Sequence, residues 1–182
     1  MGDAHMDMDS YLREIEAGWP PTGQPPSREL VTLCQQAVAA YPESSTLWYD
    51  LGILMHRCED ERGYRANDFR RCFEQAVQCD GDNAEAHQEL GYVLDVYYDD
   101  YPRAAAEFEA ALRLGAGAES HFGLARVLAQ MGDVDAAIAA LSPPACPFPD
   151  DPDIQLLRAE ILAGDWCWET REEIAQRKTD HR

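Results

Sequence analysis

The side chains best suited to bind a metal ion lie close together in the first half of the chain. His56 and Cys58 are followed by Cys72 and Cys79 on a segment with helical spacing. A tetrahedral zinc site needs ligands that converge, usually with a closely spaced pair among them. Cys72 and Cys79 are two helical turns apart and no CxxC pair occurs, so we expect core thiols rather than a metal site.

Two runs of carboxylates are candidates for calcium binding, "DVYYDDY" (95–101) and "PFPDDPD" (147–153). Both lack the alternating acids and the glycine bend of an EF-hand loop, so we expect solvated surface there. Catalytic motifs are also missing: there is no GxSxG, no phosphate-binding glycine loop, no HExxH and no Cys-His pair with an orienting group. The sequence therefore predicts no catalytic residues, no metal, no cofactor and no enzyme activity.

The stretch "HRCEDERGYRANDFRR" (56–71) gathers arginines in an otherwise acidic chain. Arginine forks bind carboxylate or phosphate, which makes a local anion-binding patch conceivable. Acidic residues are interleaved with the arginines, so ion pairing within a solvated turn is the favoured interpretation. The arginines concerned are Arg57, Arg62, Arg65, Arg70 and Arg71.

The charge balance limits the partners. The chain has 34 Asp and Glu against 15 Lys and Arg, a formal net charge of −19 over 182 residues. Such a surface repels phosphates and anionic lipids, so we predict no nucleic-acid and no membrane partner, and we favour a basic or apolar protein or peptide partner.

Several features of the sequence favour a cytoplasmic location. No apolar stretch approaches the roughly 20 residues of a membrane span, and the N-terminus lacks the apolar core of a secretory signal. The six cysteines lie in otherwise helical patterns without paired spacing, which favours free, mostly buried thiols. The "HM" pair at 5–6 also fits a cloning remnant, which leaves the status of residues 1–5 open.

A short motif that occurs three times indicates which elements position these residues. Its copies are "STLWYDLGILM" (45–55), "AEAHQELGYVL" (84–94) and "AESHFGLARVL" (118–128). Each copy has a ring-bearing residue, then Leu three residues later, then Gly or Ala, and each is followed by a second amphipathic segment. Because helices approach closely only where side chains are small, each copy predicts the first helix of a tight hairpin, and the hairpins are expected to stack.

This pattern resembles the tetratricopeptide repeat family from about Ser45 to Pro152. The spacing is 39 residues from Gly52 to Gly91 and 34 from Gly91 to Ala125. The resemblance implies an all-α fold, a right-handed α-α superhelix of helical hairpins with N- and C-terminal flanking helices. The second copy lacks the family's turn glycine and reads "YYDDYP" (97–102), whereas the third keeps it in "MGD" (131–133).

Three parts of the chain are expected. Residues 1–26 would be an N-terminal segment, with a short helix in "DSYLREIEAGW" capped by Ser10 or Asp9 and stopped by Gly18, then a proline-rich linker; an undocked terminus is the alternative. Residues 27–166 would be the repeat domain, opening with a lone second helix and ending with a lone first helix after an extended connector, "SPPACPFPDDP" (142–152). Residues 167–182 would cap the last pair, with Trp166 and Trp168 covering it.

The resemblance also implies that the first helices line a concave groove for a peptide or helix of a partner. Helical spacing outward from the core leucines selects the side chains of that face, with an aromatic track and with acids, Glu119 among them, that would steer a basic partner. The candidate partner-binding residues are Tyr49, Ile53, His56, Glu85, Gln88, Tyr92, Asp95, Phe122 and Arg126.

These features predict a non-catalytic protein–protein interaction module. One alternative is a dedicated client chaperone or inhibitor, resembling class II type III secretion chaperones, and another is an acidic polyanion mimic that sequesters a basic partner. The lysines and asparagines with which one subclass of the family grips a C-terminal carboxylate are absent, so an acidic C-terminal peptide is not expected as ligand. The oligomeric state, and whether terminal helices fill the groove, stay open.

Overall fold

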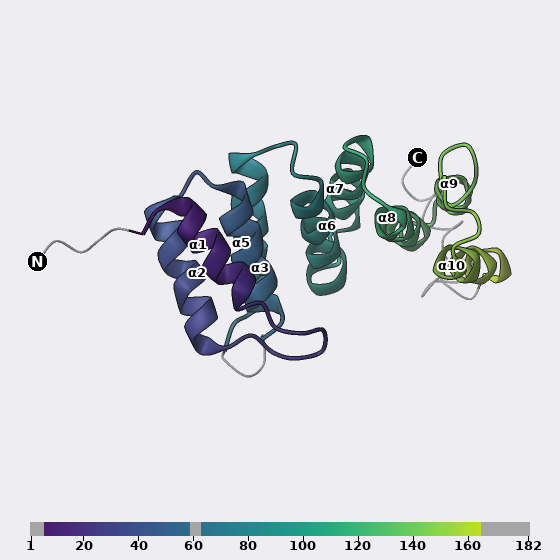
Figure 1. Ribbon diagram of the computed structural model, residues 1–182. Coiled ribbons are helices and arrows are strands. Elements are labelled where there is room, and N and C mark those ends of the chain that lie inside the picture. The colour runs from purple at the N-terminus through teal and green to yellow at the C-terminus, as the bar shows by residue number, and fades with distance from the viewer. Residues whose placement is uncertain (1–5, 59–62, 165–182) are drawn as a thin grey trace, which may run out of the picture. The chain divides into compact units, whose positions relative to one another are not determined.

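The computed structural model describes residues 6–58 and 63–164, and every regular element in these ranges is an α-helix (Figure 1). The predicted all-α class is therefore confirmed. The chain forms two compact units, which divide between Ala86 and His87. The boundaries predicted from the sequence, after residues 26 and 166, stay a prediction. None of the described helices has the length and hydropathy of a membrane span.

In the first unit each described helix packs on the next one along the chain: α1 on α2, α2 on α3, and α3 on α5 (Figure 1). The sequence presents α2 as a second helix without a first, but α1 lies beside it and supplies that partner. The helices are α1 (Met8–Ala17), α2 (Arg28–Ala40), α3 (Ser45–His56) and α5 (Ala66–Cys79).

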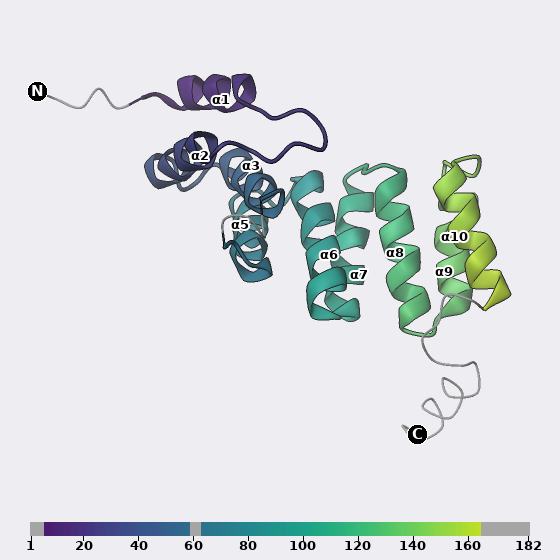
Figure 2. The same cartoon turned by 90° about the horizontal axis from the view of Figure 1, so that it is seen from below.

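In the second unit α7 packs on α8, α8 on α9, and α10 on both α8 and α9, as Figure 2 shows in the green to yellow part of the ribbon. The short α9 confirms that Pro143 and Pro144 cut the third hairpin's second helix early. The helices are α6 (Ala84–Tyr98), which begins at the end of the first unit, α7 (Tyr101–Arg113), α8 (Ala118–Gln130), α9 (Val134–Ala140) and α10 (Pro152–Ala163).

Side-chain caps fix where the helices begin. Ser27 accepts a hydrogen bond from the backbone N–H of Leu30 at 3.0 Å, which satisfies one of the free donors at the start of α2. Asp7 caps α1 in the same way: its carboxylate accepts a hydrogen bond from the backbone N–H of Ser10 at 2.8 Å. Asp7 has an extended backbone and directly precedes the first helical residue. The predicted cap at Asp9 or Ser10 is therefore wrong by at least two residues. Gly18 ends α1 as predicted.

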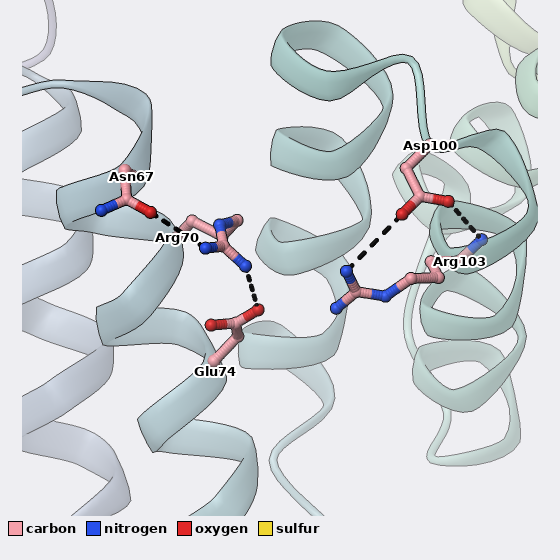
Figure 3. Close-up of polar contacts among 5 residues, drawn as sticks. All are labelled: Asn67, Arg70, Glu74, Asp100 and Arg103. Atoms are coloured by element: carbon pink, nitrogen blue, oxygen red, sulfur yellow. Dashed lines mark hydrogen bonds and ion pairs between the residues drawn. The ribbon is translucent and has the colours of Figure 1, made fainter.

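The three turns between first and second helices use the same left-handed backbone. Gly63 and Gly132 both have φ of 79°, a value that glycine adopts without strain. In the second copy, which lacks the glycine, Asp99 takes this place with φ of 50°. Asp100 then starts α7: its carboxylate accepts from the N–H of Arg103 at 3.4 Å and lies 3.5 Å from the Arg103 guanidinium (Figure 3).

Phenylalanine rings fill the space that the small residues leave. A Cβ added at Gly52 would lie 2.6 Å from the Phe73 ring, which confirms why the motif needs a small residue there. Phe108 is enclosed by two glycines, since a Cβ would lie 3.0 Å from its ring at Gly91 and 2.4 Å at Gly123. In the third copy Gly123, two residues before the Ala125 of the motif, thus makes a close contact with the preceding hairpin.

The connector before α10 folds as turns, so the prediction of an extended segment is wrong. The N–H of Cys146 donates to the Ser142 carbonyl at 3.0 Å, and the Pro143–Pro144 peptide bond is cis. Cys146 is fully buried although it lies outside any helix. The cysteines of the described ranges are free thiols, and only Cys79 among them is exposed, where a core thiol was expected.

Candidate partner-binding groove in the second unit

A pocket of about 890 Å³ lies between successive first helices of the second unit. Three elements form its walls: α6, the N-terminal half of α8, and α10 together with the residue before it. The lining residues are Gln88, Tyr92, Gly117, Ala118, Glu119, Phe122, Asp151, Asp153, Ile154, Leu156, Leu157 and Glu160.

Tyr92 is held firmly at the wall of this pocket. Its ring and that of Phe108 form a T-shaped pair with 4.9 Å between centroids, and its hydroxyl donates to the carbonyl of Glu119 at 2.8 Å. Burial, together with the nearby Glu119 carboxylate, raises the pKa of Tyr92 to about 12. A half-buried ring with fixed orientation gives a binding surface that loses little entropy on contact with a ligand.

A chain of side-chain hydrogen bonds joins α6 to α8 at the pocket. The Gln88 amide donates to the carboxylate of Glu119 at 3.0 Å, and the Ser120 hydroxyl donates to the amide oxygen of Gln88 at 2.7 Å. Gln88 thus uses both ends of its amide within the protein. Gln88 therefore lines the pocket and also holds α6 and α8 together at its wall.

Asp95 and Arg126 form an ion pair between the same two helices. The Nε of Arg126 donates to the Asp95 carboxylate at 2.7 Å, a second guanidinium nitrogen contacts the same oxygen, and the guanidinium lies 5.5 Å from the Tyr92 ring centroid. Burial raises the pKa of Asp95, and Arg126 opposes that shift. Asp95 is only 6% exposed, so its charge is balanced by Arg126 rather than presented to a partner.

The remaining predicted residues belong to the first unit. Tyr49 and Ile53 are half-buried on α3, with the Tyr49 ring 6.1 Å from that of Phe73. The His56 ring lies 4.8 Å from that of Phe69, so this side chain packs on α5. Glu85 is exposed at the start of α6. The prediction that all nine residues form one binding surface stays a prediction.

Sequence reasoning missed the wall formed by α10. The helix itself was recognised, yet its outward residues were not assigned to the groove. The sequence did contain a signal for this wall. The buried side of α10 needs only Ile154, Leu157 and Ile161, so Leu156 is an additional apolar residue on another side of the helix. Leu156 is 60% exposed and lines the pocket, so the additional leucine marks a second apolar surface.

Two arginines of the arginine-rich stretch, Arg57 and Arg70, are bonded within the protein. Arg70 donates to Glu74 at 2.5 Å and to Asn67 at 2.9 Å (Figure 3), so its ion pair lies along α5 with an acid outside the stretch, and not within a turn as predicted. Arg57 instead donates to the linker carbonyls of Pro21 at 2.9 Å and Gln24 at 3.0 Å. Across residues 6–58 and 63–164, no three His, Cys, Asp or Glu side chains gather as a metal site would require.

Some predictions fall outside the described residues. They are the capping helix at 167–182 with Trp166 and Trp168, the place of Arg62, and the status of residues 1–5.

Comparison with known proteins supports the repeat assignment. A family model described as tetratricopeptide repeat matches residues 97–161. No curated protein sequence matches the chain. Among solved structures, the fold is similar to that of YrrB, a tetratricopeptide repeat protein with an unusual peptide-binding site, at a TM-score of 0.60 and 20% identity over 72% of this chain. The chain spans 66% of YrrB, slightly less than two thirds of its length.

A second similar structure is that of a thermophilic tetratricopeptide repeat protein from Thermus thermophilus, called TTC0263. The TM-score is 0.59 and the identity 19%, over 86% of this chain and 89% of that one. Both likenesses confirm the fold class that the sequence predicts.

Proposed function

We propose that this chain, which has the tetratricopeptide repeat fold and matches the family model over residues 97–161, is a non-catalytic module that binds a peptide or helix of a partner protein. The single observation that carries the proposal is the pocket of about 890 Å³ between α6, α8 and α10. Pockets of this size with aromatic walls suit insertion of partner side chains.

Two features of the pocket support a polypeptide ligand. Tyr92 and Phe122 are half-buried, and so offer ring surface on a rigid wall. The wall is built from helices joined by hydrogen bonds and an ion pair, so it is formed before a ligand arrives. YrrB, with a similar fold, has a peptide-binding site, which supports the same use of the fold here.

The remaining parts of the proposal concern chemistry and location. The net charge of −19 favours a basic or apolar partner over nucleic acid or a membrane. We propose no catalytic role: Gln88, Tyr92 and Glu119 at the pocket act as structural links between α6 and α8. The free thiols of Cys34, Cys58, Cys72 and Cys146 support a reducing compartment such as the cytoplasm.

The test is to identify partners by affinity capture with mass spectrometry and then measure their dissociation constants with Phe122→Ala and Tyr92→Phe variants. Phe122→Ala removes pocket surface and should weaken binding by about tenfold or more, since interface aromatics contribute of the order of 2 kcal/mol. Tyr92→Phe keeps the ring and loses only the bond to Glu119, so it should weaken binding less. Circular dichroism checks that both variants remain folded.

Two results would count against groove binding. An unchanged dissociation constant in a folded variant carrying both Phe122→Ala and Tyr92→Ala would place the partner elsewhere. Binding that disappears with added salt but ignores these aromatic changes would instead support the polyanion mimic.

A further inference from the structure

The pocket of the second unit combines an apolar floor with a rim of one charge. The apolar part comes from Phe122 on α8, Tyr92 on α6 and the leucines of α10. Among the described lining residues the ionisable side chains, Tyr92 apart, are all carboxylic acids, and none is Lys, Arg or His. The acids are Glu119, Asp151, Asp153 and Glu160.

These carboxylates differ in how far the protein already uses them. Asp151 caps α10, accepting from the backbone N–H groups of Asp153 at 3.0 Å and Ile154 at 3.2 Å. Glu119 accepts from Gln88. No hydrogen bond or ion pair within the described residues uses the side chain of Asp153 or Glu160. Two carboxylates on α10 therefore remain for a ligand.

The leucines on α10 show which part of the helix faces the ligand. Leu156 is 60% exposed and lines the pocket, whereas Leu162 is 55% exposed on the same helix and does not line it. An exposed leucine beside two carboxylates suits a ligand that is apolar at its centre and cationic at its edges.

We propose that the occupant of this pocket is a segment of another protein that places one Leu, Ile, Met or Phe side chain between Tyr92, Phe122 and Leu156, with a Lys or Arg within one helical turn on either side. This inference rests on the proposed function and specifies its partner. The cationic side chains reach Asp153 and Glu160, and their aliphatic stems lie along the apolar wall. A second copy of this chain is a poor occupant, because two chains of net charge −19 repel each other.

The electrostatics of the rim predict the order of affinities. Like charges facing each other across an interface oppose binding, so an acidic flank next to four carboxylates is disfavoured. A basic flank is favoured, and the gain shrinks when salt screens exposed charges. The part of the affinity that comes from the apolar contact should depend neither on the charge of the flanks nor on the salt concentration.

The experiment measures fluorescence anisotropy of the full chain with three libraries of peptides of about 12 residues, long enough for about three helical turns. Each library has one Leu, Ile, Met or Phe at its centre, and the flanks are Lys, Gln or Glu. The Lys library should bind at least about tenfold more tightly than the Glu library at low salt, with the Gln library between them. The difference should decrease as salt is added.

Matched variants separate charge from apolar contact. Asp153→Asn with Glu160→Gln should weaken the Lys library several-fold and leave the Gln library unchanged. The control variant, Asp135→Asn with Glu109→Gln, also removes two negative charges, but from residues that do not line the pocket. It should change the affinity of neither library. Leu156→Ser should weaken all binding libraries, whereas Leu162→Ser should not.

The outcomes distinguish this inference from the proposed function. Equal binding of the Lys and Gln libraries that still requires Phe122 would overturn the basic partner and leave groove binding intact. Peptide binding that appears only after Trp166→Ala with Trp168→Ala would show that the chain's own C-terminal segment is the occupant, against this inference. No binding by any library, in the chain or its variants, would overturn both.

Discussion

The spaces between successive first helices differ sharply between the two units. In the first unit an open pocket of about 290 Å³ lies between α1 and α3, lined by Leu12, Ile15, Glu16, Trp19 and Asp50. A second pocket of this unit, about 810 Å³, lies instead between a first helix and its neighbouring second helices, α2, α3 and α5. In the second unit the corresponding space between α6, α8 and α10 is about 890 Å³. Similar helices at a similar spacing in the sequence thus produce a small cavity in one place and a large one in the other.

The connecting segments contribute differently to the two pockets. In the first unit Arg57, directly after α3, donates to carbonyls of the linker after α1, and Trp19 from this linker lines the small pocket. In the second unit the connector after α9 turns back on itself, with Cys146 bonded to Ser142, and contributes only Asp151 next to α10. The linker after α1 thus adds a wall residue, Trp19, to the smaller pocket, whereas the connector before α10 adds only its last residue to the larger one.

The largest expected effect is the loss of folding stability when one of the two packing rings, Phe108 or Phe73, is removed. Phe108→Ala should destabilise the second unit by about 4 kcal/mol, and Phe73→Ala the first unit by about 3 kcal/mol, because both rings are fully buried but only Phe108 fits against two glycines. Urea denaturation followed by circular dichroism measures both. Equal losses would contradict the view that Phe108 joins two hairpins.

A pH dependence is expected for the small cavity of the first unit. Burial raises the pKa of Asp50 from 3.8 to about 6. Because the folded chain holds this proton more tightly than the unfolded chain, stability should rise as pH falls from 7 through 6, and the gain should be complete near pH 4. Asp50→Asn should add about 1–2 kcal/mol at pH 7 and flatten this part of the profile.

The measurement is the difference between the parent chain and the variant in thermal unfolding from pH 4 to pH 8. Asp153→Asn serves as a control that removes one carboxylate from the open pocket. A parent profile that runs parallel to that of Asp50→Asn at every pH would rule out a buried carboxylate in the first unit.

The smallest expected effect concerns the turns. Asp99→Gly should stabilise the second unit by up to about 1 kcal/mol, because glycine adopts a φ of 50° with less strain than aspartate. The loss of the hydrogen bond from the Tyr101 hydroxyl to Asp99, 3.1 Å, offsets part of this. Gly132→Ala, the reverse change at φ of 79°, should lower the melting temperature. A lower melting temperature for Asp99→Gly would contradict the prediction.

Much of the fold follows from local rules that a sequence displays. The Gly or Ala beside each motif Leu predicted a close helix contact, and at Gly52 and Gly91 the rings of Phe73 and Phe108 occupy that contact. The turn at Asp99 could not be recognised in the same way, since aspartate reaches the left-handed region only where the surrounding structure imposes it. The partner of α2 was missed because α1 lacks the repeat motif and joins through a long linker.

The candidate site was less predictable than the fold. Helical spacing brought out Tyr92, Gln88 and Phe122, which line the pocket. It also brought out Asp95, whose charge Arg126 balances, because spacing gives the side of a helix and not the partner across it. The contribution of α10 depends on the turn structure of residues 142–151, which no periodicity encodes.

Phe108 also bears on how the second unit comes apart. Its ring belongs at once to the hairpin of Gly91 and to that of Gly123, so neither hairpin can open without exposing a surface of the other. In a stacked array, such a shared contact is the coupling between neighbours that makes unfolding cooperative. Backbone amides of α6 and α8 should therefore exchange their hydrogens with deuterium through one common opening event.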